Sequence, residues 1–228
     1  EHSRRFLLSE GFRKDHVFVT GSPLFEVLKE NKININNSKI LKKLNLKSKK
    51  YFVVSAHREE NIDIEDNFLN LAFALNAIAE IYKLPIIFST HPRTKKQINI
   101  KKIKFHPLIS NIEPLGFFDY VHLQKNSYCV LSDSGTINEE SSIMNFPALN
   151  IREAHERPEG MEEASVMMVG LGQERIIQAI EILENKPIGE ERILRNVYDY
   201  SMPNVSEKVL RIIHSYVDYV NRVVWKKY

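Results

Sequence analysis

The sequence is poor in cysteine and free of long apolar runs, and each shortage excludes a class of protein. Its single cysteine, Cys129, rules out an internal disulfide and a cage of thiolates around a metal. A lone thiol also fits a reducing compartment, so we expect a cytoplasmic protein. No stretch reaches the roughly 18 consecutive apolar residues that a membrane-spanning helix needs. The sequence therefore predicts no membrane partner.

Glycine is also scarce, and its placement excludes several motifs. The eight glycines form no GxGxxG fingerprint, no phosphate-binding P-loop and no GxSxG nucleophile turn. The net charge is only +3, which is too small to predict a nucleic-acid partner. We interpret the lysine clusters at 39–50 and 93–104 as solvated surface.

What the sequence does contain is an alternation of β-rich and helical segments. Six short apolar runs predict strands, at residues 17–21, 51–56, 86–90, 128–132, 147–151 and 165–169. Apolar positions three and four residues apart predict helices between them, at 68–82, 117–126, 137–145 and 173–185. Continuous apolar runs are typical of strands covered on both faces. We therefore predict an α/β fold with a Rossmann-like, doubly wound parallel sheet.

The chain ends in a predicted long helix that begins near Asn204. Asn204 and Glu207 have the spacing of a capping box, although asparagine replaces the usual serine or threonine. Apolar residues then recur along one side, at Val209, Ile213, Tyr216, Val220 and Val223. We divide the chain into residues 1–203 and a terminal helix at 204–228; the family resemblance given below implies that the first part is a C-terminal nucleotide-binding domain and that the helix crosses toward a missing N-terminal domain.

Polar loops follow four of the predicted strands. These are "HREEN" (57–61), "HPR" (91–93), "DSGT" (133–136) and "REAHERPEG" (152–160). In open α/β sheets, ligands bind beyond the carboxyl ends of the strands. The four loops are therefore predicted to form the functional site.

The stretch "VLSDSGTINEES" (130–141) reads as a strand, a tight turn and a helix start. Gly135 permits either a close backbone approach or a positive φ, and Ser134, Gly135 and Thr136 would present N–H groups to an anion such as a phosphate. The acids Glu139 and Glu140 could accept hydrogen bonds from a ribose. An alternative is an ordinary N-cap by Asp133 or Ser134, with both acids complementing the helix dipole.

The other loops leave alternatives open. Arg152, His155 and Arg157 could bind a phosphate through an arginine fork, or could be solvated surface charges. His57 could act as a general acid or base, or could cap the next helix. A metal site built from His57 with Glu60 and His91 is possible, but no HExxH spacing supports it, so we predict no metal.

Together, "AHREEN" (56–61), "SDSGTINEES" (132–141) and "HERPEG" (155–160) resemble the non-hydrolysing UDP-N-acetylglucosamine 2-epimerase family. The opening "SRRFLLSEGF…VFVTGSPLFEVL" is similar to the family's passage into its C-terminal domain, so we expect the chain to be the C-terminal part of a longer protein. "SGTINEES" and "HERPEGMEEASVM" resemble the branch that makes UDP-N-acetyl-L-fucosamine. The family fold is two Rossmann-like domains facing a cleft, as in B-type glycosyltransferases.

The resemblance implies a role for individual residues. Ser134, Gly135 and Thr136 would bind the diphosphate, Glu140 the ribose and Arg157 the phosphates. Tyr120 stands where the family places a residue beside the uracil. Arg58 would belong to the UDP site, and His57 corresponds to the family's active-site histidine. Thr136 departs from the family, where many members have a second glycine, and it argues against a turn made only of glycines.

The resemblance also implies a reaction without a cofactor. The C2 hydrogen of such a sugar is not acidic, and the missing nicotinamide fingerprint favours elimination of UDP over transient oxidation. The family's proposed base comes from the first domain, so we expect this chain alone to bind UDP without epimerising it. The family suggests a homodimer and a role in capsule or O-antigen synthesis. A glycosyltransferase of the same fold and a non-catalytic nucleotide-sugar sensor are the alternatives.

Overall fold

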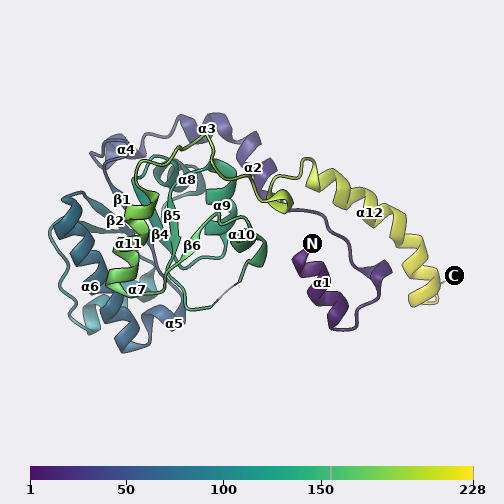
Figure 1. Ribbon diagram of the computed structural model, residues 1–228. Helices are drawn as coiled ribbons and strands as arrows, with labels where there is room; N and C mark the ends of the chain where they lie inside the picture. The colour runs from purple at the N-terminus through teal and green to yellow at the C-terminus, as the bar shows by residue number, and fades with distance from the viewer. Residues whose placement is uncertain (155, 228) are drawn as a thin grey trace.

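The computed structural model describes residues 1–154 and 156–227, and its centre is a parallel sheet (Figure 1). Six strands pair in the order β3-β2-β1-β4-β5-β6. Their bounds are Phe52–Ser55 (β1), Ile86–Ser89 (β2), Ile109–Ile112 (β3), Cys129–Ser132 (β4), Ala148–Asn150 (β5) and Met167–Met168 (β6). All five pairings are parallel. The predicted doubly wound α/β fold is therefore confirmed.

The strand order reverses between β1 and β4. After β1 the chain proceeds to β2 and β3 and then returns to pair β4 with the other side of β1. In the register, Ser55 at the end of β1 lies opposite Ser89 on one side and Ser132 on the other. Such a reversal separates the loops at the carboxyl ends of the two strands, which leaves a crevice where ligands bind in folds of this type.

Helices cover both faces of the sheet, because side chains along each strand alternate between the faces. Phe52 and Val54 pack against one layer, which contains α6 and α11, whereas Val53 packs against the other, which contains α4, α8 and α9. The helices are α1 (His2–Ser9), α2 (Leu24–Glu30), α3 (Lys32–Asn36), α4 (Ile40–Lys43), α5 (Glu59–Ile62), α6 (Glu65–Tyr82), α7 (Pro92–Ile100), α8 (Phe117–Lys125), α9 (Thr136–Met144), α10 (Pro158–Glu162), α11 (Gln173–Leu183) and α12 (Val205–Tyr219). None of them is both long and apolar enough to cross a bilayer, within the residues that the structure describes.

The two terminal helices, α1 and α12, lie on the same side of the molecule, away from the sheet (Figure 1). Helix α12 continues as a π-helix over Val220–Val224 and runs beside the segment that follows α1. The rings of Phe18 and Tyr216 meet edge to face, with centroids 5.0 Å apart. Both α1 and the outer side of α12 carry exposed apolar side chains, among them Phe6, Leu210 and Ile213.

Two predictions about strands were wrong. Residues 17–21 form no strand and belong to no sheet, and the ring of Phe18 packs against Tyr216 of the terminal helix instead. The edge strand β3 was missed because Ser110 and Asn111 are exposed and break the apolar run that would have signalled it. An edge strand pairs with another strand on one side only, so more of its side chains are exposed and fewer of them need to be apolar.

The predicted capping box at the start of α12 is absent. Asn204 adopts a left-handed conformation with φ of 55°, and its side chain caps no N–H group. The Ser206 N–H donates instead to Glu26 at 3.1 Å. Glu207 turns outward and pairs with Arg211. A carboxylate from α2 thus replaces the local cap, which no nearby sequence signal indicated.

Candidate functional site

Three of the four polar loops meet at one edge of the sheet. The loops beginning at His57, Asp133 and Arg152 follow the neighbouring strands β1, β4 and β5. The fourth loop follows β2, begins a helix, and contacts the first loop through an ion pair between Arg93 and Glu59. There, His91 accepts a hydrogen bond from the Arg93 N–H at 3.4 Å and caps α7. The switch point between β1 and β4 therefore lies at the centre of the candidate site.

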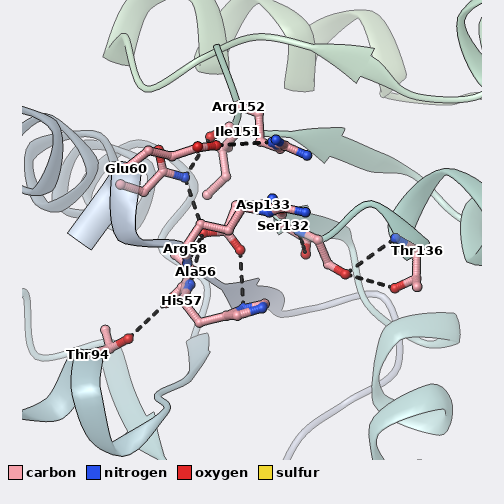
Figure 2. A network of polar contacts seen from close by, with 12 residues as sticks. Ala56, His57, Arg58, Glu60, Thr94, Ser132, Asp133, Thr136, Ile151 and Arg152 are labelled. Carbon is pink, nitrogen blue, oxygen red and sulfur yellow. Dashed lines mark hydrogen bonds and ion pairs between the residues drawn. The ribbon is translucent and has the colours of Figure 1, made fainter. Parts of the chain in front are cut away.

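Asp133 joins the first two loops (Figure 2). Its side chain is fully buried, and Oδ2 accepts hydrogen bonds from the backbone N–H groups of His57 and Arg58, both at 2.9 Å, and from Asn61 Nδ2 at 3.2 Å. Oδ1 lies 3.2 Å from Nδ1 of the His57 ring. The ring itself is 48% exposed, so its Nδ1 edge faces Asp133 while much of the ring is open to solvent. His57 does not cap α5, whose N-cap is Arg58.

Glu156 brings two arginines together beside the glycine loop. Arg58 donates to the Asp133 carbonyl through Nε at 2.9 Å and to both Glu156 oxygens through Nη2, at 2.9 and 3.2 Å. Arg152 also pairs with Glu156. A Cβ atom on Gly135 would lie 2.6 Å from Glu156 Oε2. An anionic group is therefore already held by two guanidinium groups against Gly135.

This close approach explains the glycine. The φ of Gly135 is −63°, a value open to any residue, so the position needs a missing side chain and not a left-handed turn. Thr136, the first residue of α9, likewise has no positive φ. The doubt that Thr136 raised is thereby removed, because the loop does not depend on a second glycine.

The start of α9 keeps an unused donor. The Ser134 N–H donates to Ser132 Oγ at 3.1 Å, and the Thr136 N–H makes a long 3.3 Å contact with Ser134 Oγ. The N-cap of α9 is Gly135, without a side-chain cap, so the alternative of an ordinary N-cap by Asp133 or Ser134 was wrong. The Gly135 N–H has no partner among residues 1–154 and 156–227. Such free donors at a helix start attract anions.

Arg157 lies on the other side of the helix start. Its Nη2 pairs with Glu139 Oε1 at 2.8 Å, and the Ser22 hydroxyl donates to the second oxygen of that carboxylate. The Arg157 Nε atom is buried and has no partner in the described part of the chain. Thr136, Glu139 and Arg157 together form one wall of a cavity of about 590 Å³ that extends to α1 and Tyr200. A cationic donor thus borders an open space.

Glu140 has different partners from Glu139. Gln124 on α8 donates to Glu140 Oε2 at 2.7 Å. Burial is the largest cause that raises the pKa of Glu140, because the charged form is desolvated. Tyr120 lies one turn before Gln124; burial first, and then the charge of Glu140, raises the pKa of its hydroxyl. The structure therefore brings Glu140 and Tyr120 together, as a carboxylate beside an aromatic ring.

Sequence reasoning found most of these residues but missed what connects them. Asp133 was considered only as a helix cap, and Asn61, Gln124 and Glu156 were not singled out. The acid directly after β4 was the one available signal for Asp133, because it stands at a strand's carboxyl end. His155 lies outside the described residues. Within those residues no three potential metal ligands cluster, and His57, Glu60 and His91 form no such group.

Comparison with known proteins assigns this chain to a family. The family model described as UDP-N-acetylglucosamine 2-epimerase matches residues 1–214. A UDP-N-acetylglucosamine 2-epimerase from Methanocaldococcus jannaschii is 35% identical over 212 residues, which are 86% of this chain and 58% of that protein. The chain thus spans little more than half the length of this curated relative.

Solved structures agree with the sequence comparison. The UDP-N-acetylglucosamine 2-epimerase of Rickettsia bellii matches all of this chain and 61% of its own, with 45% identity and a TM-score of 0.91. The M. jannaschii enzyme in complex with UDP-GlcNAc and UDP matches 92% of this chain and 57% of its own, with 32% identity and a TM-score of 0.81. Because its sequence and fold both match, this chain belongs to the UDP-N-acetylglucosamine 2-epimerase family, and it corresponds to about 60% of the length of such an enzyme.

Proposed function

We propose that this chain forms the UDP-binding part of an epimerase that inverts C2 of a UDP-N-acetylhexosamine. The observation that carries the proposal is the pair of unused donors at the switch point. Within the described residues the Gly135 N–H at the start of α9 and the buried Arg157 Nε have no partner, and that Nε lies 3.6 Å from the place of a Cβ atom on Gly135. Both suit a diphosphate, which accepts hydrogen bonds at several oxygens.

The reaction we propose is elimination followed by re-addition. A base removes the C2 proton, the C1–O bond breaks, and its electron pair leaves with UDP, so that a glycal with a double bond between C1 and C2 forms. UDP then attacks C1 again while C2 takes a proton on the opposite face. Negative charge grows on the diphosphate as the C1–O bond breaks, so donors fixed at the Gly135 loop and Arg157 favour the transition state over the bound substrate.

The remaining site residues take the roles that the resemblance implies. Ser134 and Thr136 complete the diphosphate loop, Glu140 accepts from the ribose hydroxyls, and Tyr120 lies beside the uracil. The closeness of Glu140 to Tyr120 supports this division, because the ribose and the base of a nucleotide are adjacent. His57 faces the sugar as the proposed catalytic group, with its ring open to solvent.

Arg58 already has two partners at the place where a diphosphate would bind. Its guanidinium is held by the Asp133 carbonyl and by Glu156. A diphosphate placed against Gly135 would compete with the Glu156 carboxylate for that position. We therefore propose that Glu156 moves aside when UDP binds, which frees Arg58 and Arg152 for the phosphates.

The proposal extends to a second domain. Helix α12 and α1 lie apart from the sheet, and the exposed apolar side chains of Leu210, Ile213 and Val217 recur along one side of α12. These features support the predicted role of residues 204–228, which include α12, as a helix that packs against a further domain of the intact protein. That domain would supply the base and close over the glycal and UDP. The homodimer is also a prediction, which sedimentation of the intact protein would test.

For the product we propose UDP-N-acetyl-L-fucosamine or UDP-N-acetylmannosamine, destined for a bacterial surface polysaccharide. The motifs "SGTINEES" and "HERPEGMEEASVM" support the first of these. Incubation of the intact protein with each candidate UDP-sugar, followed by separation of the C2 epimers, would identify the substrate. Conversion of neither sugar would contradict this part of the proposal.

Exchange of the C2 hydrogen in heavy water tests the reaction itself. We expect the intact protein to incorporate deuterium at C2, and this chain alone to bind UDP without any exchange. Turnover by the chain alone would refute the division of labour between two domains. Release of UDP only when an acceptor is added, without C2 exchange, would instead identify a glycosyltransferase. Binding without exchange by the intact protein would identify a sensor.

A further inference from the structure

The two oxygens of the Asp133 carboxylate have separate partners. Oδ2 receives three N–H groups, from the His57 and Arg58 backbones and from Asn61. Oδ1 is buried and has no hydrogen-bond partner of good geometry within the described residues, and Nδ1 of the His57 ring lies 3.2 Å away, at ion-pair distance. The same carboxylate thus contacts both the main chain and the ring of His57 (Figure 2).

This arrangement favours one position for a proton. A buried carboxylate oxygen without a donor is costly, and a small rotation of the His57 ring, whose Nδ1 is 3.2 Å away, would bring an Nδ1–H onto Oδ1. In the neutral imidazole one ring nitrogen carries the proton and the other is an acceptor. When Nδ1 carries it, the Nε2 lone pair remains free.

We propose that Asp133 is a positioning residue, which holds the neutral His57 ring as the Nδ1–H tautomer so that Nε2 is presented as an acceptor. Nε2 then accepts a hydrogen bond or a proton from a hydroxyl or amide N–H of the ligand and returns it at the same atom, while Nδ1 keeps its own proton. The identity of that ligand as a UDP-sugar rests on the function proposed above. The tautomer itself does not depend on it.

The alternative is that Asp133 serves only as an anchor between the loops after β1 and β4. Asp133→Asn separates the two roles, because the amide oxygen can still accept the backbone N–H groups while the NH₂ group faces His57 Nδ1. That nitrogen must then become an acceptor, which moves the ring proton to Nε2. A carboxylate-to-amide exchange of this kind in Ser-His-Asp hydrolases yields the wrong tautomer and lowers kcat by about 10⁴-fold.

The test is ¹⁵N spectroscopy of the intact protein labelled at histidine, at a pH where titration shows the ring to be neutral. A His57→Gln spectrum identifies the His57 signals. We expect the wild-type ring to carry its proton on Nδ1 and the Asp133→Asn ring to carry it on Nε2, with kcat lowered about 10²- to 10⁴-fold and KM changed far less.

Thr94→Val is the matched control. Thr94 is buried and donates to the Ala56 carbonyl at 3.1 Å, one residue before His57, without contacting the ring. This variant should loosen the same loop and leave the tautomer unchanged. A change of tautomer in Thr94→Val would show that general loosening is sufficient, and would overturn the assignment to Asp133.

The wild-type spectrum alone tests the proposed Nδ1–H tautomer, even if the Asp133→Asn protein fails to fold. A neutral wild-type His57 with its proton on Nε2 would overturn the inference, as would an Asp133→Asn protein with unchanged tautomer and kcat. The outcome is separate from that of the proposed function. A protein that binds no UDP but carries the Nδ1–H tautomer would refute the function and leave the role of Asp133 intact.

Discussion

Replacing Arg157 with alanine removes the side chain on which the diphosphate site most depends. Arg157 makes two kinds of contribution: its Nη2 pairs with Glu139 at 2.8 Å, and its buried Nε has no partner among the described residues. The first contribution stabilises the fold and the second is available to a ligand. The substitution should therefore lower both the stability of the protein and its affinity for UDP.

The two losses can be estimated separately. A hydrogen bond to a charged group contributes about 1–3 kcal/mol, so the loss of Arg157 should weaken UDP binding about five- to 150-fold. Glu139 is 8% exposed and would retain only the Ser22 hydroxyl as a partner. A buried carboxylate that loses its partner costs a similar amount, so the free energy of unfolding should fall by about 1–3 kcal/mol.

A second substitution separates these effects. Glu139→Gln removes the charge that Arg157 balances, so the Arg157→Ala/Glu139→Gln protein should recover much of the lost stability without recovering UDP affinity. Arg157→Lys keeps the charge but loses the planar fork, and should bind UDP with intermediate affinity. Arg195→Ala is the control, because Arg195 is 82% exposed and pairs with Glu163 at the surface, where ion pairs contribute little.

Calorimetric titration with UDP measures the affinities, and urea unfolding measures the stabilities. If Arg157→Ala binds UDP as tightly as the wild type, Arg157 does not belong to the site. If the double variant regains both stability and affinity, the loss of binding came from disturbed folding and the assignment is also wrong.

Three further substitutions test the rest of the site. Burial raises the pKa of Glu140, so the ionised carboxylate lowers the stability of the fold above that pKa and has no such effect below the ordinary carboxyl range. Glu140→Gln should therefore raise Tm at neutral pH, and this gain should vanish as the pH falls to about 4. The affinity for UDP should drop in the same variant. An equal Tm gain at all pH values would contradict this reasoning. Gly135→Ala places a methyl group where the Glu156 carboxylate now lies, and should weaken UDP binding at least about tenfold. Tm should change little, because only the flexible Glu156 side chain must shift. Unchanged UDP affinity in calorimetry would exclude a close approach of the phosphate to Gly135. Glu156→Gln removes the anion that competes for Arg58, and should tighten UDP binding, whereas weaker binding would mean that Glu156 supports the ligand.

The sequence was a good guide to the sheet and to the loops. Five of the six predicted strands and all five predicted helices were found, because continuous apolar runs and three-to-four spacing directly reflect which faces are buried. The exceptions have physical causes. Residues 17–21 are apolar because Phe18 packs on the terminal helix, and β3 is polar because an edge strand exposes Ser110 and Asn111.

The sequence named candidate residues of the site but not their pairings. His57, Ser134 and Arg157 were named from loops at strand ends, and Arg58 was named from the family resemblance. Nothing in those loops indicated that Asp133 faces the ring of His57 across 76 residues of sequence, or that Glu156 lies between Arg58 and Arg152. Such pairs depend on the strand order, which local patterns leave open.

By itself, then, the sequence determined the element types, the parallel α/β class, the family and the loops that carry polar residues, since these depend on apolar spacing and on short motifs. Only the tertiary structure decided which residues touch. The order β3-β2-β1-β4-β5-β6 places the ends of β1 and β4 side by side, and there a buried carboxylate on one loop must find its donors on the other. Long-range burial and hydrogen bonding, unlike periodicity, are settled only when the strands pair.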